Sequence, residues 1–193
     1  MNCIIIHGCP GDEEKAMDSQ RRSYDKHWIP WAKTELEKKG IKTITPLMPN
    51  PWRPDYESYK KFFEQFDIDE ETVLIGHSCG CAFLVRWLGD TGKKIRKLIL
   101  VAPWKLPSGT GERYENRRNF YEYPIDKKIR DNVQEIVIFT SDDEEEDGKI
   151  SVKMFHQVLG GHIIEIRGYG HYCLNGNMKS EEFPQLIKEV IKR

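Results

Sequence analysis

The chain has 193 residues, of which 38% are hydrophobic and 32% charged, a composition typical of one globular domain with a well-charged surface. The formal net charge of -1 gives no electrostatic reason to expect nucleic acid or an anionic membrane as a partner. Five cysteines without a CxxC pair, and an N-terminus without a secretory signal, favour reduced thiols in a cytoplasmic protein.

Short apolar segments alternate along the chain with longer segments of helical period. The predicted strands are rich in β-branched residues and span residues 3–6, 43–45, 72–75, 97–101, 136–140 and 163–166. Apolar residues at three- and four-residue spacing predict helices over residues 28–39, 56–66, 79–88, 151–159 and 181–191. This alternation predicts the α/β class, with a doubly wound, mainly parallel sheet covered by helices on both faces, in a single domain over residues 1–193. In such a sheet, reactive groups gather beyond the carboxyl ends of the strands.

The first predicted strand is followed by the turn His7-Gly8-Cys9-Pro10-Gly11. A histidine–glycine turn at this place commonly directs a backbone N–H towards a nucleophile on a neighbouring strand. We therefore predict that the backbone amide of Cys9 is one donor of an oxyanion hole. The alternative is an ordinary glycine-rich turn.

The third predicted strand runs into Gly76-His77-Ser78-Cys79-Gly80, and a predicted helix follows at once. G-x-S-x-G between a strand and a helix is typical of a nucleophile elbow, in which the serine is strained and the glycines avoid the neighbouring backbone. The turn also places free N–H groups of a helix N-terminus beside the serine, where they stabilise an oxyanion. We predict Ser78 as the nucleophile and the amide of Cys79 as the second oxyanion donor. The alternative is an ordinary strand–helix turn; a phosphate-binding loop is disfavoured because G-x-x-x-x-G-K-[ST] is absent.

Aromatic residues follow two of the predicted strands. Trp52 comes after the second strand, and Trp104 begins the long segment between residues 101 and 125, which is predicted to form a short wall or partial lid. Both tryptophans are predicted to line the substrate cleft, where apolar bulk suits an acyl or aryl ester. Packing in the core is the alternative role for each.

A serine hydroxyl needs a base that takes its proton and an acid that orients the base. In this arrangement the acid follows a later strand and the base follows the last one. After the fifth predicted strand, Asp142 and Asp143 are both candidates that spacing does not separate, and residues 144–147 are predicted to be a solvated acidic loop. Of the six histidines, His171 follows the last predicted strand on a glycine-rich loop, and it is the predicted base.

Several segments together resemble the YdeN-like and retinoblastoma-binding protein nine-like small serine hydrolases of the α/β-hydrolase superfamily. The likeness rests on IIIHG (4–8), WIPWAKTEL (28–36), MP (48–49), IGHSCG (75–80), SDD (141–143) and GH (170–171). The resemblance implies a six-stranded sheet in the order 2-1-3-4-5-6 and selects Asp143 as the acid beside Ser78 and His171. The chain departs from the family where the acidic run and Gly148 replace a proline-containing segment.

The predicted function is a serine hydrolase that cleaves a small ester, amide or thioester through an acyl-enzyme on Ser78. The predicted partner is a small acyl compound, and no cofactor or metal is expected. The resemblance leaves a second hypothesis open, because members of this family have been described as binding proteins. The chain would then be a protein-interaction module of the same fold with little or no catalytic role.

Overall fold

A parallel sheet forms the centre of the computed structural model, which describes residues 1–107, 111–174 and 176–192. Its order is β2-β1-β3-β4-β5-β6, and each neighbouring pair is parallel. The strands are β1 (Asn2–Ile6), β2 (Lys42–Ile44), β3 (Thr72–His77), β4 (Ile95–Val101), β5 (Val133–Ser141) and β6 (His162–Ile166). The six predicted strands and the order that the resemblance implied are therefore confirmed.

Helices connect the strands on both faces of the sheet. They are α1 (Glu13–Met17), α2 (Ile29–Lys38), α3 (Tyr56–Phe63), α4 (Cys79–Thr91), α5 (Gly111–Tyr121), α6 (Ile129–Asn132), α7 (Glu146–Leu159) and α8 (Pro184–Ile191). The five predicted helices are present. The short helices α1 and α6 and the strongly polar α5 were not predicted, because none of them carries a clear apolar stripe.

Helix α7 begins five residues earlier than predicted, inside the acidic run. Glu146 and Asp147 occupy its first turn, where the partial positive charge of the helix N-terminus favours acidic side chains. The acidic run is therefore partly helical rather than a loop throughout.

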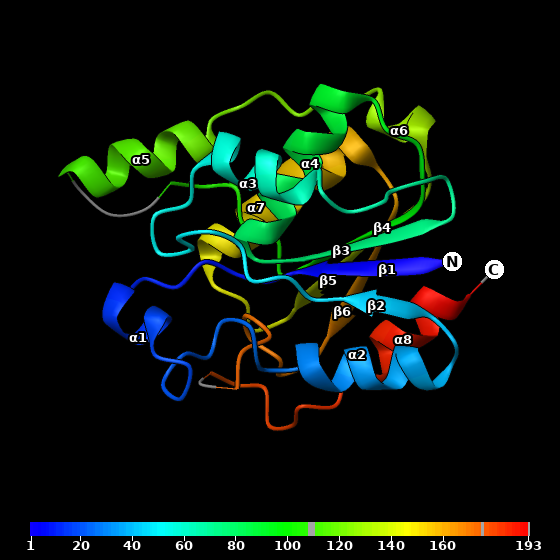
Figure 1. Ribbon diagram of the computed structural model, residues 1–193, viewed down its shortest axis with the longest axis horizontal. Coiled ribbons are helices and arrows are strands. Elements are labelled where there is room, and N and C mark those ends of the chain that lie inside the picture. The colour runs from blue at the N-terminus through cyan, green and yellow to red at the C-terminus, as the bar shows by residue number, and fades with distance from the viewer. Residues whose placement is uncertain (108–110, 175, 193) are drawn as a thin grey trace.

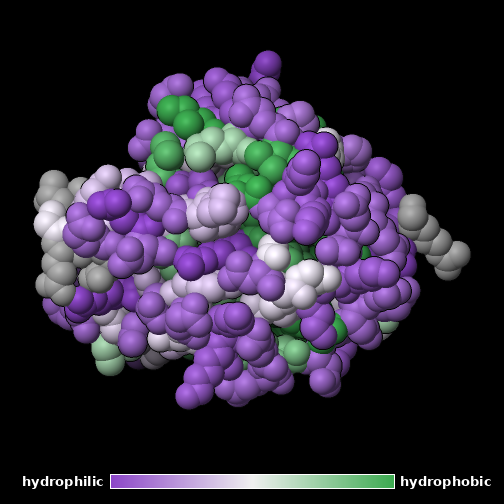
Figure 2. All heavy atoms as spheres, turned by 90° about the horizontal axis from the view of Figure 1, so that it is seen from above, coloured by the Kyte–Doolittle hydropathy of each residue, from purple (hydrophilic) through white to green (hydrophobic). Residues whose placement is uncertain are grey.

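Two layers of side chains form the core, one on each face of the sheet. One layer packs the sheet against α3, α4, α6 and α7, and the other packs it against α2 and α8, as Figure 1 shows. Strand β3 is buried along its whole length, which explains why its centre is a continuous apolar run without polar alternation. Seen from above, the surface is mainly hydrophilic with smaller hydrophobic areas between (Figure 2).

The carboxyl ends of the strands lie on the left of Figure 1, on the side where α1 and α5 extend from the body. The segment predicted as a wall or partial lid contains α5, but residues 108–110 of that segment lie outside the described residues. Within the described ranges, no helix is both long and apolar enough to cross a membrane.

Candidate active site

Ser78 lies on a tight turn between β3 and α4. Its backbone has φ 53° and ψ -119°, an unfavourable region for a residue with a side chain and one that is found at functional sites. The Ser78 amide donates to the Val101 carbonyl at 3.0 Å, and the Ser78 carbonyl accepts from the Trp104 amide at 3.2 Å. The end of β4 and the residues after it therefore hold the strained turn in place.

The two glycines of the pentapeptide are required by close backbone contacts. A Cβ at Gly76 would lie 2.7 Å from the Cys81 nitrogen, and one at Gly80 would lie 2.6 Å from the Ile6 carbonyl oxygen. Such distances are too short for any side chain without movement of the backbone. The structure thus has the local geometry of the predicted elbow.

His171 lies in the loop after β6, and its ring faces Ser78. The His171 Nε2 atom lies 2.8 Å from the Ser78 Oγ. The His171 carbonyl accepts a hydrogen bond from the buried His77 ring at 2.9 Å. Ser78 and His171, which are 93 residues apart in the sequence, are therefore brought together as predicted.

The other nitrogen of the His171 ring faces a glutamate. His171 Nδ1 lies 3.1 Å and 3.0 Å from the two carboxylate oxygens of Glu144. The Glu144 side chain is fully buried, and its Oε1 also accepts from the Glu145 amide at 2.9 Å. A ring protonated on Nδ1 can donate to Glu144 while Nε2 accepts the hydroxyl proton of Ser78.

This geometry corrects two expectations for the acidic run. Asp143, expected as the partner of His171, is exposed and binds elsewhere: it accepts from the Gly170 amide at 2.8 Å, from the Ser141 hydroxyl and from the Asn177 side chain. These hydrogen bonds hold the pKa of the Asp143 carboxyl below its usual value. Glu144, expected in a solvated loop, is buried with only 4% of its surface exposed.

The turn after β5 explains why Glu144, and not Asp143, contacts the His171 ring. The Glu144 amide donates to the Ser141 carbonyl at 3.3 Å, and this turn directs Asp143 towards the loop before His171 and Glu144 towards the ring. Gly148 on α7 leaves room for the longer side chain, because a Cβ there would lie 2.7 Å from the Glu144 Cγ and Cδ. A glycine four residues after an acidic residue was the available sequence signal for this arrangement.

The predicted oxyanion residues lie next to the nucleophile. Cys79 is the first residue of α4, so its amide has no acceptor within the helix. Cys9 lies in the turn after β1, and among the described residues its amide has no acceptor in the protein. The two side chains form a disulfide, which corrects the expectation of reduced thiols at these positions, while Cys3, Cys81 and Cys173 are free.

Comparison with known proteins places this chain in a family. The chain matches the family described as serine hydrolase over residues 19–190. It belongs to the serine hydrolase family. The "Putative hydrolase YdeN" of Bacillus subtilis (strain 168) is 26% identical over 179 residues, which cover 86% of this chain and 87% of that protein. "Serine hydrolase RBBP9" of Rattus norvegicus is 29% identical over 169 residues, which cover 84% of each chain.

Solved structures share the fold of this serine hydrolase. The structure of the ydeN gene product of B. subtilis superposes with a TM-score of 0.79 at 22% identity, covering 100% of this chain and 99% of that one. Est1E from Butyrivibrio proteoclasticus, solved with ferulic acid bound, gives a TM-score of 0.64 at 13% identity, covering 100% and 87% of the two chains. Both likenesses support the α/β-hydrolase fold.

A cavity of about 600 Å³ opens beside Ser78 and His171. Its walls include the turn after β1, and charged side chains of both signs also line it: Asp12, Lys15, Arg21 and Arg22. Each of the three cationic side chains is paired with a neighbouring carboxylate. His27 and His77 also line it, and burial lowers the pKa of both imidazoles, so that they are neutral near pH 7. The cavity is more polar than the aromatic cleft that the sequence indicated.

The two predicted substrate-binding tryptophans lie at different places. The Trp104 ring packs edge-on against the His171 ring, with 5.4 Å between centroids, and is held by a hydrogen bond from its indole N–H to the Leu106 carbonyl. Trp52 instead lines a separate cavity of about 430 Å³ together with Asn50 and Asn119. The expectation for Trp52 at the cavity of Ser78 is therefore wrong.

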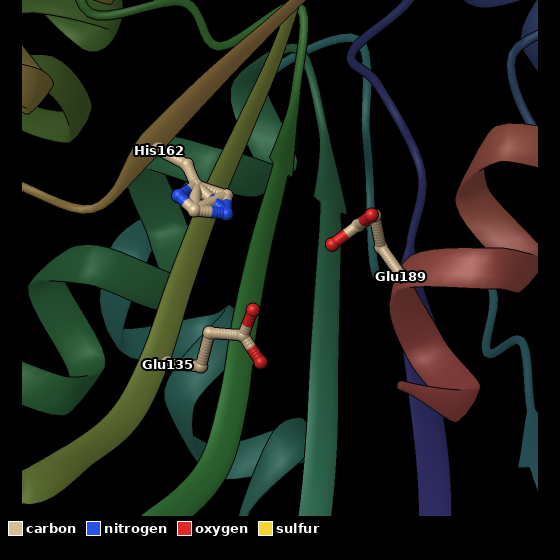
Figure 3. Close-up of side chains that lie close together, drawn as sticks. All are labelled: Glu135, His162 and Glu189. Atoms are coloured by element: carbon tan, nitrogen blue, oxygen red, sulfur yellow. The ribbon is translucent and has the colours of Figure 1, made fainter. Parts of the chain in front are cut away.

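One further group of side chains has the donor types of a metal site. Glu135 on β5, His162 on β6 and Glu189 on α8 (Figure 3) offer ligand atoms within 4.8 Å of one another. The Lys97 ammonium, however, lies 2.7 Å from the Glu135 carboxylate, and Lys192 lies within 4.0 Å of both glutamates. These ammonium groups already compensate the carboxylates, and the group lies at the amino ends of the strands, opposite Ser78.

Proposed function

We propose that the protein hydrolyses a small carboxylic ester through an acyl-enzyme on Ser78, with His171 as the base and Glu144 as the acid that orients it. The observation that carries this proposal is the continuous path from the Glu144 carboxylate through the His171 ring to the Ser78 hydroxyl. This is the arrangement that a serine nucleophile needs, whatever the order of its parts along the chain.

Each residue has a defined task in the proposed reaction. The Ser78 oxygen attacks the ester carbonyl carbon while its proton moves to His171 Nε2, and the Glu144 carboxylate stabilises the imidazolium that forms. The amides of Cys9 and Cys79 hold the oxyanion. The imidazolium then protonates the leaving alcohol. In the second half of the reaction a water molecule, deprotonated by His171, attacks the acyl carbon, and the imidazolium returns a proton to the Ser78 oxygen as the acid leaves.

The cavity sets the class of substrate in this proposal. A volume of about 600 Å³ lies within the range of small-molecule sites, and the charged side chains of both signs that line it favour a small polar acyl compound over a long alkyl chain. Thioesters and amides use the same residues, so a panel of acetyl esters, thioesters and anilides would rank the three classes.

Labelling with a fluorophosphonate probe tests the proposal. The folded protein should be labelled on Ser78, and the labelling should disappear in Ser78→Ala and fall strongly in His171→Ala. Ser58→Ala is a matched control, because Ser58 is exposed on α3 and its loss should leave labelling unchanged. A folded wild-type protein that neither reacts with the probe nor hydrolyses any ester of the panel would refute the proposal and favour the interaction module.

A cytoplasmic location and a small acyl partner remain parts of this proposal. Stable disulfides are rare in the cytosol, and those that occur there commonly respond to redox conditions. A cytoplasmic location would therefore assign the Cys9–Cys79 disulfide a functional rather than a purely structural role. Cell fractionation would test the location.

A further inference from the structure

The two residues assigned to the oxyanion hole are joined to each other by a disulfide. Cys9 and Cys79 are 70 residues apart in the sequence, and their Cα atoms lie 5.7 Å apart. We propose that this disulfide positions the Cys9 amide in the oxyanion hole, so that the oxidised protein is the fast esterase and a dithiol reductant slows it. The inference rests on the proposed function of Ser78.

The two ends of the disulfide are held very differently by the rest of the protein. Cys79 is completely buried in the first turn of α4, where Gly80 packs directly against the Ile6 carbonyl. Cys9 is half-buried in the turn between β1 and α1. The rigid end at Cys79 therefore serves as an anchor for the turn that carries the Cys9 amide.

The position of that turn matters because it touches the nucleophile. A Cβ at Gly8 would lie 3.2 Å from the Ser78 Cβ, so the backbone before Cys9 passes in close contact with the elbow. Oxyanion donors act only when they lie within hydrogen-bonding distance of the developing charge, and loss of one donor lowers kcat by about 10²–10³-fold. A shift of about 1 Å in a positioning group is enough to cost much of that effect.

The disulfide can be reached by a small thiol. Cys9 lines the cavity that contains Ser78, whereas Cys79 lies behind it. A thiolate of a dithiol reductant attacks the Cys9 sulfur, the S–S bond breaks, and the Cys79 sulfur leaves and takes a proton. The second thiol of the reductant then displaces Cys9 as a thiol. The protein gains two thiols and the reductant becomes a disulfide.

Reduction should therefore change the chemical step more than substrate binding. With p-nitrophenyl acetate as substrate, we expect dithiothreitol to lower kcat by about tenfold or more while KM changes little. The affinity for methylboronic acid, whose adduct on Ser78 places an oxygen in the oxyanion hole, should fall in parallel. Reoxidation should restore both values.

A double variant, Cys9→Ser with Cys79→Ser, gives the matched control. It should have the low kcat of the reduced protein and should not respond to dithiothreitol. Circular dichroism of the reduced and variant proteins at the assay temperature tests whether a loss of activity merely follows unfolding.

Three results would overturn the inference. The first is a kcat that is equal in the oxidised and reduced proteins. The second is a fall in kcat on reduction that matches the unfolded fraction of the reduced protein. The third is peptide mapping that finds Cys9 and Cys79 as free thiols in protein purified without reductant. If the oxidised protein is folded yet inactive towards ester and fluorophosphonate alike, the proposed function fails, and this inference fails with it.

Discussion

Replacement of Glu144 by glutamine is the sharpest test of the active-site geometry. Both carboxylate oxygens of Glu144 lie within 3.1 Å of His171 Nδ1, and the side chain is buried, so the amide would occupy the same place without the negative charge. The variant would no longer stabilise the imidazolium, and its NH₂ group could hold the wrong ring tautomer. A loss of this kind lowers kcat by about 10⁴-fold, or about 5.5 kcal/mol of transition-state stabilisation.

Asp143→Asn is the matched comparison for this experiment. The Asp143 side chain contacts the loop before His171 through the Gly170 amide rather than the ring itself, and an asparagine oxygen can still accept that hydrogen bond. We expect kcat to fall by less than about tenfold, since a loss of 1.36 kcal/mol corresponds to a factor of ten.

Steady-state hydrolysis of p-nitrophenyl acetate, with thermal unfolding measured for both variants, decides between the two acids. The reasoning from the structure would be refuted if the kcat of Glu144→Gln stayed within tenfold of the wild-type value while the kcat of Asp143→Asn fell a thousandfold. It would also restore the acid that the family resemblance selected. Glu144→Asp, which keeps the charge on a shorter side chain, should retain more activity than Glu144→Gln.

Two further changes test the surroundings of the site and of the first strand. Gly148→Ala should lower kcat by about tenfold or more, because its Cβ would displace the Glu144 carboxylate. The melting temperature should change little, since the helix propensity of alanine offsets the packing cost of the added Cβ. An unchanged kcat would show that Glu144 needs no such room. Burial lowers the pKa of His7 to about 4, below its ordinary value of about 6.5, so between these two pH values the unfolded chain binds more protons than the folded one. The contribution of the neutral His7 to the free energy of unfolding should be fully present above about pH 6.5. It should fall by up to about 3 kcal/mol as the pH drops towards 4, as measured by urea unfolding. His7→Gln, whose oxygen can still accept from the Met48 amide that His7 Nε2 binds, should show a smaller fall; an equal fall would assign the effect to other groups.

Much of the fold followed from local features of the sequence. Buried parallel strands read as apolar runs, amphipathic helices read as apolar stripes, and a strand–turn–helix with glycines around a serine marks Ser78, because each of these signals depends on neighbouring residues. The loop that carries His171 was found in the same way, from its place after the last strand.

Only the tertiary structure determines which way a side chain points and which residues far apart in the sequence come into contact. Asp143 and Glu144 are adjacent in the sequence, and only the turn after β5 and the space at Gly148 determine which carboxylate faces His171. Cys9 and Cys79 are too far apart in the chain for spacing to predict their disulfide. The parallel pairing of β1 with β3 brings the turns after these two strands together. The nucleophile, its oxyanion donors and the disulfide therefore lie side by side.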